Sequence, residues 1–235
     1  MGLADLHIHT IYSYDGTASV PAVLRQARKV GLDVIAITDH DEIRGALEAV
    51  ELASYYGIEV IPGVEITTSQ GDLLALFIKE PIKAGLPLLD TIWKVRDLGG
   101  ICIAPHPMAR GMGMKSLSAH SILKVLRIPE MAETLIALEG YNATALDRAS
   151  NRAAILLGLR SGLTLVGNSD AHMLEAIGLG ATEFEGQSAS ALLYALRSGQ
   201  TSIRRQKEWN SLRILSTWAL NYLGSTFTRM AMATR

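Results

Sequence analysis

The chain has 235 residues, is 49% hydrophobic and carries a formal net charge of −1. This length is sufficient for one full hydrophobic core, and single-domain α/β barrels commonly fall in this range. The near-neutral charge excludes a global positive field that would hold a long nucleic-acid duplex. The one cysteine, Cys102, excludes an internal disulfide framework.

The N-terminal sequence MGLADLHIHT lacks the basic stretch and the long apolar run of a secretion signal, so we expect a cytoplasmic protein. Every apolar run is shorter than the roughly 18 residues of a membrane span. We therefore expect no integral membrane segment.

Short apolar runs alternate with longer segments of helical period along the chain. Strands are expected at 2–8, 32–38, 58–66, 73–78, 99–105, 134–140 and 163–169. Helices are expected at 19–31, 42–57, 87–99, 116–128, 143–162 and 188–199, and five of these six end in glycine, as helices often do. The alternation predicts a mostly parallel sheet covered by helices. Closure of the seven strands into a barrel is the economical arrangement, and periodicity alone leaves an open doubly wound sheet as the alternative.

Polar residues lie at the C-terminal ends of five expected strands. They are His7 and His9; Asp39, His40 and Asp41; Glu65; His106; and Asp170 and His172. In a parallel barrel these ends meet at one rim, where barrel enzymes carry their active sites. Five of the six histidines would converge there, whereas His120 falls in an expected helix and is interpreted as a surface residue.

The pair His7 and His9 carries the strongest local signal. Alternate strand residues point to the same face, so both imidazoles are expected in the barrel mouth, with Leu6 and Ile8 packed toward the helices. Two neutral imidazoles on one side of a strand can hold one metal ion, with carboxylates from other strands as anionic ligands. Without a cation, buried carboxylates would repel each other, so a metal centre is the simplest explanation.

Each motif also has an ordinary structural explanation. Asp41 would serve as the N-cap of a helix that begins near Ile43. Glu65 would be a strand-end acid, and His106 a rigid turn residue between two prolines. The occurrence of all five motifs at consecutive strand ends favours metal binding over five separate coincidences.

The motifs DLHIHT, ITDHD, GVEITT, APHP and NSDAH, in this order, resemble those of the PHP (polymerase and histidinol phosphatase) family over nearly all of residues 1–200. The resemblance implies a distorted (β/α)7 barrel with the metal site at the C-terminal rim of the strands. It also implies two or three divalent metal ions (Mn, Fe or Zn) and hydrolysis of phosphoesters. The chain looks most similar to stand-alone members, which include nucleotide phosphatases and short-RNA 5′ exonucleases.

The resemblance also implies a set of ligands for each ion. One ion would be held by His7, His9, Glu65 and Asp170, a second by Glu65 and His106, and a third by Asp15, His40 and His172. Similar enzymes usually have a further histidine where this chain has Asp72, so we expect an altered metal preference at the second site. They also carry a capping insert that is missing between Asp72 and His106, so we expect a more open mouth.

Paired cations lower the pKa of a bound water and neutralise phosphoryl charge, so no serine or cysteine nucleophile is needed. Glu65 is the expected bridging ligand, and His172 would stabilise the leaving oxygen if the third ion is absent. Arg110 and Asn142 are expected to contact substrate from the rim, although Arg110 also fits a solvated loop residue. Cys102 is interpreted as core packing. Because the imidazoles must be neutral to bind metal, we expect activity to fall at acid pH.

We divide the chain into a phosphoesterase domain, 1–203, and a C-terminal helical extension, 204–235. An apolar stripe at helical spacing from Trp209 to Leu223 predicts a helix packed on the barrel or at a homo-oligomer contact. Peripheral membrane contact through Arg204, Arg205 and Lys207 is one alternative, and a partner-binding helix is another.

These features predict a metal-dependent phosphoric ester hydrolase. Its expected substrates are small phosphomonoesters or phosphodiesters, with nucleotides or short single-stranded oligonucleotides favoured and no stable duplex bound. The alternatives are a histidinol-phosphate-type phosphatase, a metal-barrel C–N hydrolase and a non-catalytic metal-binding accessory domain. Many C–N hydrolases use a modified lysine where this chain has Glu65, and an accessory domain would be expected to have lost ligands.

Overall fold

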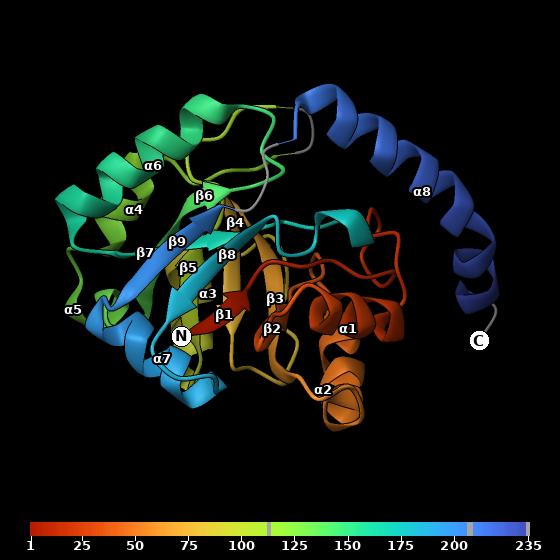
Figure 1. Cartoon of the computed structure of the whole chain (residues 1–235). Helices are drawn as coiled ribbons and strands as arrows, with labels where there is room; N and C mark the ends of the chain where they lie inside the picture. The colour runs from red at the N-terminus through yellow and green to blue at the C-terminus, as the bar shows by residue number, and fades with distance from the viewer. Residues whose placement is uncertain (112–113, 206–208, 234–235) are drawn as a thin grey trace.

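The structure is a computed structural model that describes residues 1–111, 114–205 and 209–233, with the backbone alone for 227–233. Its strands form one sheet in the order β7-β6-β5-β4-β3-β2-β1-β8-β9, which curves into a nearly closed barrel (Figure 1). The strands are β1 (Gly2–Asp5), β2 (Val34–Ile37), β3 (Glu59–Thr68), β4 (Gly71–Leu76), β5 (Ile101–Ala104), β6 (Leu135–Asn142), β7 (Thr164–Asn168), β8 (Gly180–Phe184) and β9 (Thr201–Arg205). The helices are α1 (Val20–Lys29), α2 (Arg44–Tyr56), α3 (Leu88–Asp97), α4 (Ala119–Val125), α5 (Pro129–Ala132), α6 (Arg148–Ser161), α7 (Ala189–Ser198) and α8 (Ser211–Ala233).

The distorted α/β barrel that the sequence predicts is confirmed, with two corrections. The seven expected strands are β1 to β7, but β8 and β9 were missed because their sequences, GATEF and TSIRR, lack an apolar run. The sheet is mixed rather than mostly parallel. Its β1–β2–β3 and β5–β6–β7 segments are parallel, whereas β4, β8 and β9 pair antiparallel with their neighbours.

Short side chains bring the two ends of the sheet together. The Thr182 hydroxyl on β8 accepts a hydrogen bond from the Gly167 N–H (3.1 Å) and donates one to the Gly167 carbonyl (2.9 Å) on β7. The Thr201 hydroxyl on β9 donates to the Leu165 carbonyl at 2.8 Å. A Cβ atom at Gly167 would lie 2.7 Å from the Ala181 carbonyl oxygen, so glycine is required for this close approach.

Helix boundaries follow from local chemistry. The Asp147 carboxylate accepts the Ala149 N–H at the start of α6, which ends at Gly162 in the left-handed conformation with φ of 77°. Asp41 does not cap α2. It has a φ of 54°, and its carboxylate instead accepts the Thr67 N–H at 2.7 Å, which ties the end of β2 to β3.

Two hydrophobic cores line the two faces of the sheet. The outer core packs β-strand residues against α1 to α6 and includes Cys102, which is fully buried as expected. The inner core fills the barrel, and α7 contributes Leu192 and Leu196 to it. Ile8 packs in the outer core as predicted, but Leu6 belongs to the inner core. The alternation breaks after β1, where the Leu6 N–H donates to the Asn168 side-chain carbonyl at 2.9 Å.

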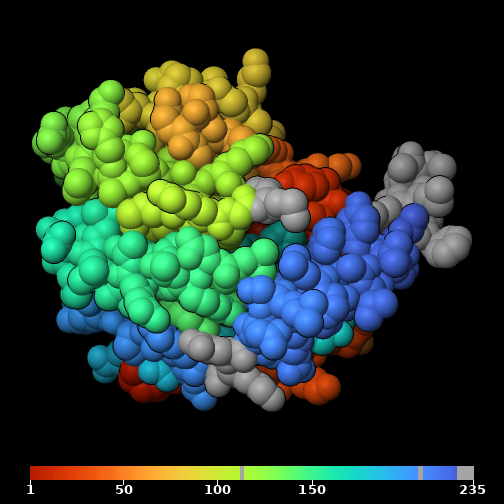
Figure 2. Space-filling view, turned by 90° about the horizontal axis from the view of Figure 1, so that it is seen from above, coloured from red at the N-terminus to blue at the C-terminus, as the bar shows by residue number. Residues whose placement is uncertain are grey.

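Helix α8 follows β9 in the chain, begins near the start of α6, and runs over the end of the barrel and then away from it (Figure 1). Its start is fixed by Arg148, which donates to the Trp209 carbonyl at 2.6 Å, and by Ile214, which is 7% exposed. Seen from above, α8 lies beside the N-terminal segment (Figure 2). Lys207, which the sequence analysis considered for membrane contact, lies outside the described residues. None of the helices in the described ranges is long and apolar enough to cross a bilayer.

Candidate metal centre

The structure brings eight of the nine predicted ligands into one group, which we call the polar cluster. Its members are His7, His9, Asp15, His40, Glu65, His106, Asp170 and His172. They fall into three overlapping sets in which the ligand atoms lie within 4.8 Å of one another. Seven members of the polar cluster lie in the segments that follow the C-terminal ends of β1, β2, β5 and β7. Glu65 lies within β3.

Glu65 lies at the middle of the polar cluster and is 1% exposed. Its Oε2 is 3.1 Å from His7 Nε2 and 3.2 Å from His40 Nδ1. The same oxygen is 3.3 Å from His9 Nε2, and Oε1 is 3.0 Å from His106 Nε2. Four imidazoles from three parts of the chain therefore face one carboxylate.

Asp170 joins the polar cluster from the other side. Its Oδ1 lies 3.4 Å from His7 Nε2, 3.3 Å from His9 Nε2 and 3.5 Å from His172 Nδ1. The residue has a φ of 53°, a conformation that costs free energy for a side chain other than glycine. The backbone is held there by the Thr144 hydroxyl, which donates to the Asp170 carbonyl at 2.9 Å.

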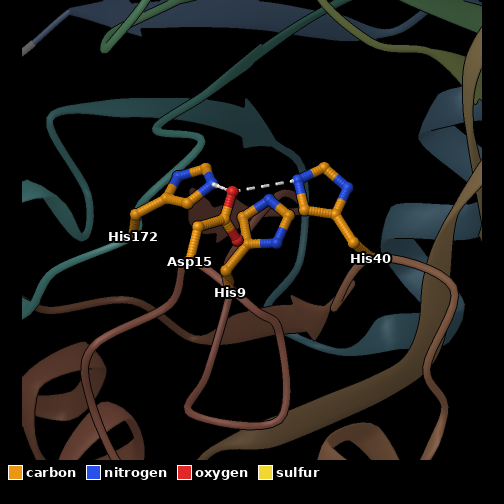
Figure 3. A group of neighbouring side chains, drawn as sticks. All are labelled: His9, Asp15, His40 and His172. Atoms are coloured by element: carbon orange, nitrogen blue, oxygen red, sulfur yellow. Dashed lines mark ion pairs between the residues drawn. The ribbon is translucent and has the colours of Figure 1, made fainter. Parts of the chain in front are cut away.

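The outermost set combines Asp15 with three imidazoles (Figure 3). Asp15 Oδ2 lies 3.2 Å from His172 Nε2 and 3.4 Å from His40 Nε2, and His9 lies between these two rings. The Tyr14 ring stacks on His40 with 5.0 Å between ring centroids. His40 and His172 are partly exposed, so this set faces the opening of the site.

Glu139 supports the polar cluster and was missed in the sequence analysis. This fully buried carboxylate lies 2.8 Å from His7 Nδ1 and accepts the His106 N–H at 2.7 Å. It thereby directs Nε2 of His7 toward Glu65. The sequence signal for Glu139 is an acid inside the apolar run TLIALEG. It was missed because only residues at the ends of strands were considered as candidates.

Asn142 lies behind the ligands rather than at the rim. It is fully buried, and its amide donates to Glu139 Oε2 (3.1 Å) and Asp170 Oδ2 (3.0 Å). Its side-chain oxygen Oδ1 accepts the Thr144 and Ala145 N–H groups. Asn142 thus contacts two carboxylates of the site, and its expected contact with substrate stays a prediction. Arg110 is exposed and precedes Gly111, which lines the cavity described below.

Asp72 lies beside the polar cluster but in none of the three sets found among the described residues. It is 2% exposed and lines the same cavity. Burial and the neighbouring Glu65 charge raise the pKa of its carboxyl from 3.8 to about 6. Within the described part of the chain its Oδ1 makes no hydrogen bond, although the atom is buried.

Strong electrostatic coupling links the members of the polar cluster. Burial alone would raise the pKa of Glu65, but the imidazoles of His7 and His40 lower it well below its usual range. Burial opposes protonation of His7 and His40, yet the adjacent carboxylates raise the pKa of both, that of His40 to about 9. Positive charge at the centre of the carboxylates is therefore strongly favoured.

The donor set fits divalent metal ions. Among the described residues, His9 Nδ1 and Asp72 Oδ1 are both buried without a hydrogen-bond partner. Unsatisfied buried polar atoms are rare and call for an explanation such as an ion. Imidazole and carboxylate together suit Zn, Fe and Mn. A cavity of about 410 Å³ opens directly onto the polar cluster, and residues of α8 line another side of it.

Comparisons with known proteins agree with this geometry. The PHP domain family model matches residues 5–146, more than half of the chain, and a PHP-associated region matches residues 148–201. An uncharacterized protein of Methanocaldococcus jannaschii is 43% identical over 114 residues, which are 44% of this chain and 67% of that protein.

Two solved structures share the fold. One is a two-domain protein from Bacteroides vulgatus containing a PHP-like metal-dependent phosphoesterase, with a TM-score of 0.71 and 20% identity over 87% of this chain. This chain spans 64% of that protein. The other is PsfC from Pseudomonas syringae, with a TM-score of 0.69 and 19% identity over 95% of this chain and 98% of that one.

Proposed function

Because this chain belongs to the PHP domain family, we propose that it is a metal-dependent phosphoesterase that hydrolyses small phosphate esters. The observation that carries the proposal is the position of Glu65, where four imidazoles face one buried carboxylate beside an open cavity. The geometry suits two or three divalent ions, Mn, Fe or Zn, with Glu65 shared between two of them.

Bound divalent ions would supply an activated water and neutralise phosphoryl charge. The protein's own part is to hold the ligands still. Glu139 and Asn142 fix His7 and Asp170 from behind, so these side chains need little rearrangement when an ion binds. His172 lines the cavity with its ring partly exposed, and with only two ions bound it would stabilise the oxygen of the leaving group.

The proposed substrates are phosphomonoesters or phosphodiesters, including nucleotides and short single-stranded oligonucleotides. Histidinol phosphate belongs to the same chemical class and is one member of the substrate panel below. The proposal favours ester hydrolysis over C–N hydrolysis because Glu65 occupies the position between the metal-ligand sets. Of the residues described around the polar cluster, none is a lysine that could serve as a modified bridging ligand.

The test combines metal content with turnover on one sample. Protein purified without chelator is analysed for metals, then assayed with p-nitrophenyl phosphate, its bis-ester, nucleotides, an oligonucleotide and histidinol phosphate. We expect two or three ions per chain and phosphate release. The His106→Gln variant should lose metal and activity, whereas the matched variant His120→Gln, on the exposed face of α4, should keep both. Bound metal without turnover on any ester would contradict the proposal.

A further inference from the structure

The cavity above the polar cluster has a wall of different chemistry. Ile214, Leu215 and Trp218 of α8 line it opposite the imidazoles and carboxylates. Further apolar side chains complete the wall, namely Met114, Leu146 and Met173. A ligand whose phosphate reaches the polar cluster would therefore place its organic part against apolar surface.

The indole of Trp218 is held in place by the site itself. Its Nε1–H donates to the Asp15 carbonyl at 2.9 Å, and its ring lies 5.1 Å from that of Tyr222. The Asp15 carboxylate belongs to the polar cluster. The wall is therefore fixed relative to the predicted ligands by a direct hydrogen bond, and a ring on the ligand would meet a surface that is already ordered.

The charges around the cavity limit how many phosphates a ligand can carry. The lining residues that the structure describes include four carboxylates, Asp15, Glu65, Asp72 and Asp170, and neither lysine nor arginine. A phosphate beyond the reach of metal ions would need cationic side chains to offset its charge. The lining therefore suits one phosphate on an otherwise apolar molecule.

We propose that α8 makes this site selective for esters with a single phosphate and an apolar, ring-bearing organic group, which packs against Trp218 and Leu215. This inference rests on the proposed phosphoesterase function, whose sequence-based expectation of nucleotides or short oligonucleotides it narrows. Oligonucleotides, with a charge on every linkage, fit the described lining poorly.

Phosphonates test the preference for an apolar, ring-bearing group by binding alone, because they have no ester leaving group and are not hydrolysed. The dissociation constants of methylphosphonate, phenylphosphonate and benzene-1,4-diphosphonate are measured by calorimetry on Mn-loaded protein whose metal content is known. We expect phenylphosphonate to bind at least about tenfold more tightly than methylphosphonate, because its ring buries apolar surface. The second phosphonate group should weaken binding.

Variants assign the preference to α8. Trp218→Ala should remove most of the phenyl preference, whereas Trp218→Phe should keep much of it although the bond to Asp15 is lost. Because Trp218→Ala can loosen α8, Leu215→Ser provides a second, milder change in the wall and should also reduce the preference. Leu212→Ala is the matched control on the same helix, since Leu212 is 77% exposed and does not line the cavity.

Three results would overturn the inference: equal binding of methyl- and phenylphosphonate, failure of both to bind, or a preference that survives both Trp218→Ala and Leu215→Ser. Tighter binding of the diphosphonate would overturn the limit to one phosphate. The phosphoesterase proposal is judged separately, because absence of hydrolysis across the ester panel contradicts it whatever the phosphonates do.

Discussion

Oε1 of Glu139 lies 2.8 Å from Nδ1 of His7, and both side chains are fully buried. This contact sets which nitrogen of His7 faces the other ligands. A carboxylate behind a metal-binding imidazole also increases its basicity, and loss of such a partner commonly weakens metal binding about 10- to 100-fold.

Glu139→Gln is therefore expected to weaken metal binding within that range while the protein stays folded, because the amide retains hydrogen bonding without the negative charge. Competition against a chelator of known affinity measures the change. Glu133→Gln is the control, since Glu133 is 74% exposed and lies away from the polar cluster. Unchanged metal affinity in Glu139→Gln would contradict the assigned role.

Asp72→Asn is expected to stabilise the metal-free protein at pH 7. In protein purified without chelator, the same variant is expected to contain less metal. The pKa of Asp72 is raised on folding, from 3.8 to about 6. The Asp72 carboxyl thus binds a proton more tightly in the folded protein than in the unfolded chain. The free energy of unfolding therefore falls as the pH rises from 3.8 to about 6, and this loss of stability is complete above that range. Removal of the charge should recover about 1–2 kcal/mol after allowance for solvent screening.

Denaturant unfolding of chelator-treated protein at pH 4 and pH 7 measures this effect. The stabilisation by Asp72→Asn should be present at pH 7 and largely absent at pH 4. Asp97→Asn, an exposed change on α3, should have little effect at either pH. A destabilised Asp72→Asn protein at pH 7 would show that the carboxylate is satisfied without metal.

Metal binding near neutral pH is expected to release protons. The carboxylates raise the pKa of His7 and His40 in the metal-free protein, that of His40 to about 9. The stabilisation that these charged imidazoles give the folded protein is fully present below the unfolded pKa of about 6.5. It is lost as the pH rises through their pKa values in the folded protein. Because metal binds only the neutral imidazole, ions must displace these protons, and affinity and activity should fall as the pH is lowered.

Calorimetric titration of Mn into chelator-treated protein, repeated at pH 7 in buffers of different ionisation enthalpy, counts the protons released. We expect at least about one proton per chain. Binding enthalpies that do not depend on the buffer would rule out protonated imidazoles in the metal-free site.

Gly167→Ala is expected to destabilise the fold by about 1–3 kcal/mol, because the added Cβ would meet the Ala181 carbonyl at 2.7 Å where the two ends of the sheet join. Thermal and denaturant unfolding measure the loss. Gly224→Ala on α8 is the control, since a Cβ there meets open space and alanine favours the helix. Equal stability of the two variants would mean that the barrel seam relaxes without cost.

The sequence was most informative where a strand is apolar and ends in a ligand-type residue. All seven runs that became β1 to β7 are apolar, and five of them end at ligand-type residues such as His7, His40 and Asp170. The strands β8 and β9 escaped because a strand at the seam of a barrel can be half polar. Asn142 was assigned to the rim because position along a strand does not reveal which polar groups stand behind it.

The sequence period also predicted the helix α8, but it did not predict where α8 lies in the fold. A stripe of apolar residues shows that one face of a helix is covered without showing what covers it. Here Ile214 and Trp218 pack against the outer core and also line the cavity beside the polar cluster. That location includes a hydrogen bond between Trp218 and Asp15, two residues 203 positions apart, and no local sequence pattern encodes such a contact.

The hydrogen bond between Trp218 and Asp15 also bears on how such a protein can diversify. The predicted metal ligands are contributed by residues 7–172, whereas much of the apolar wall comes from a helix that supplies none of them. Under the proposal made above, substitutions along 214–218 would redirect selectivity without altering a predicted metal ligand. Two proteins with the same ligand motifs would then differ in substrate wherever this helix differs.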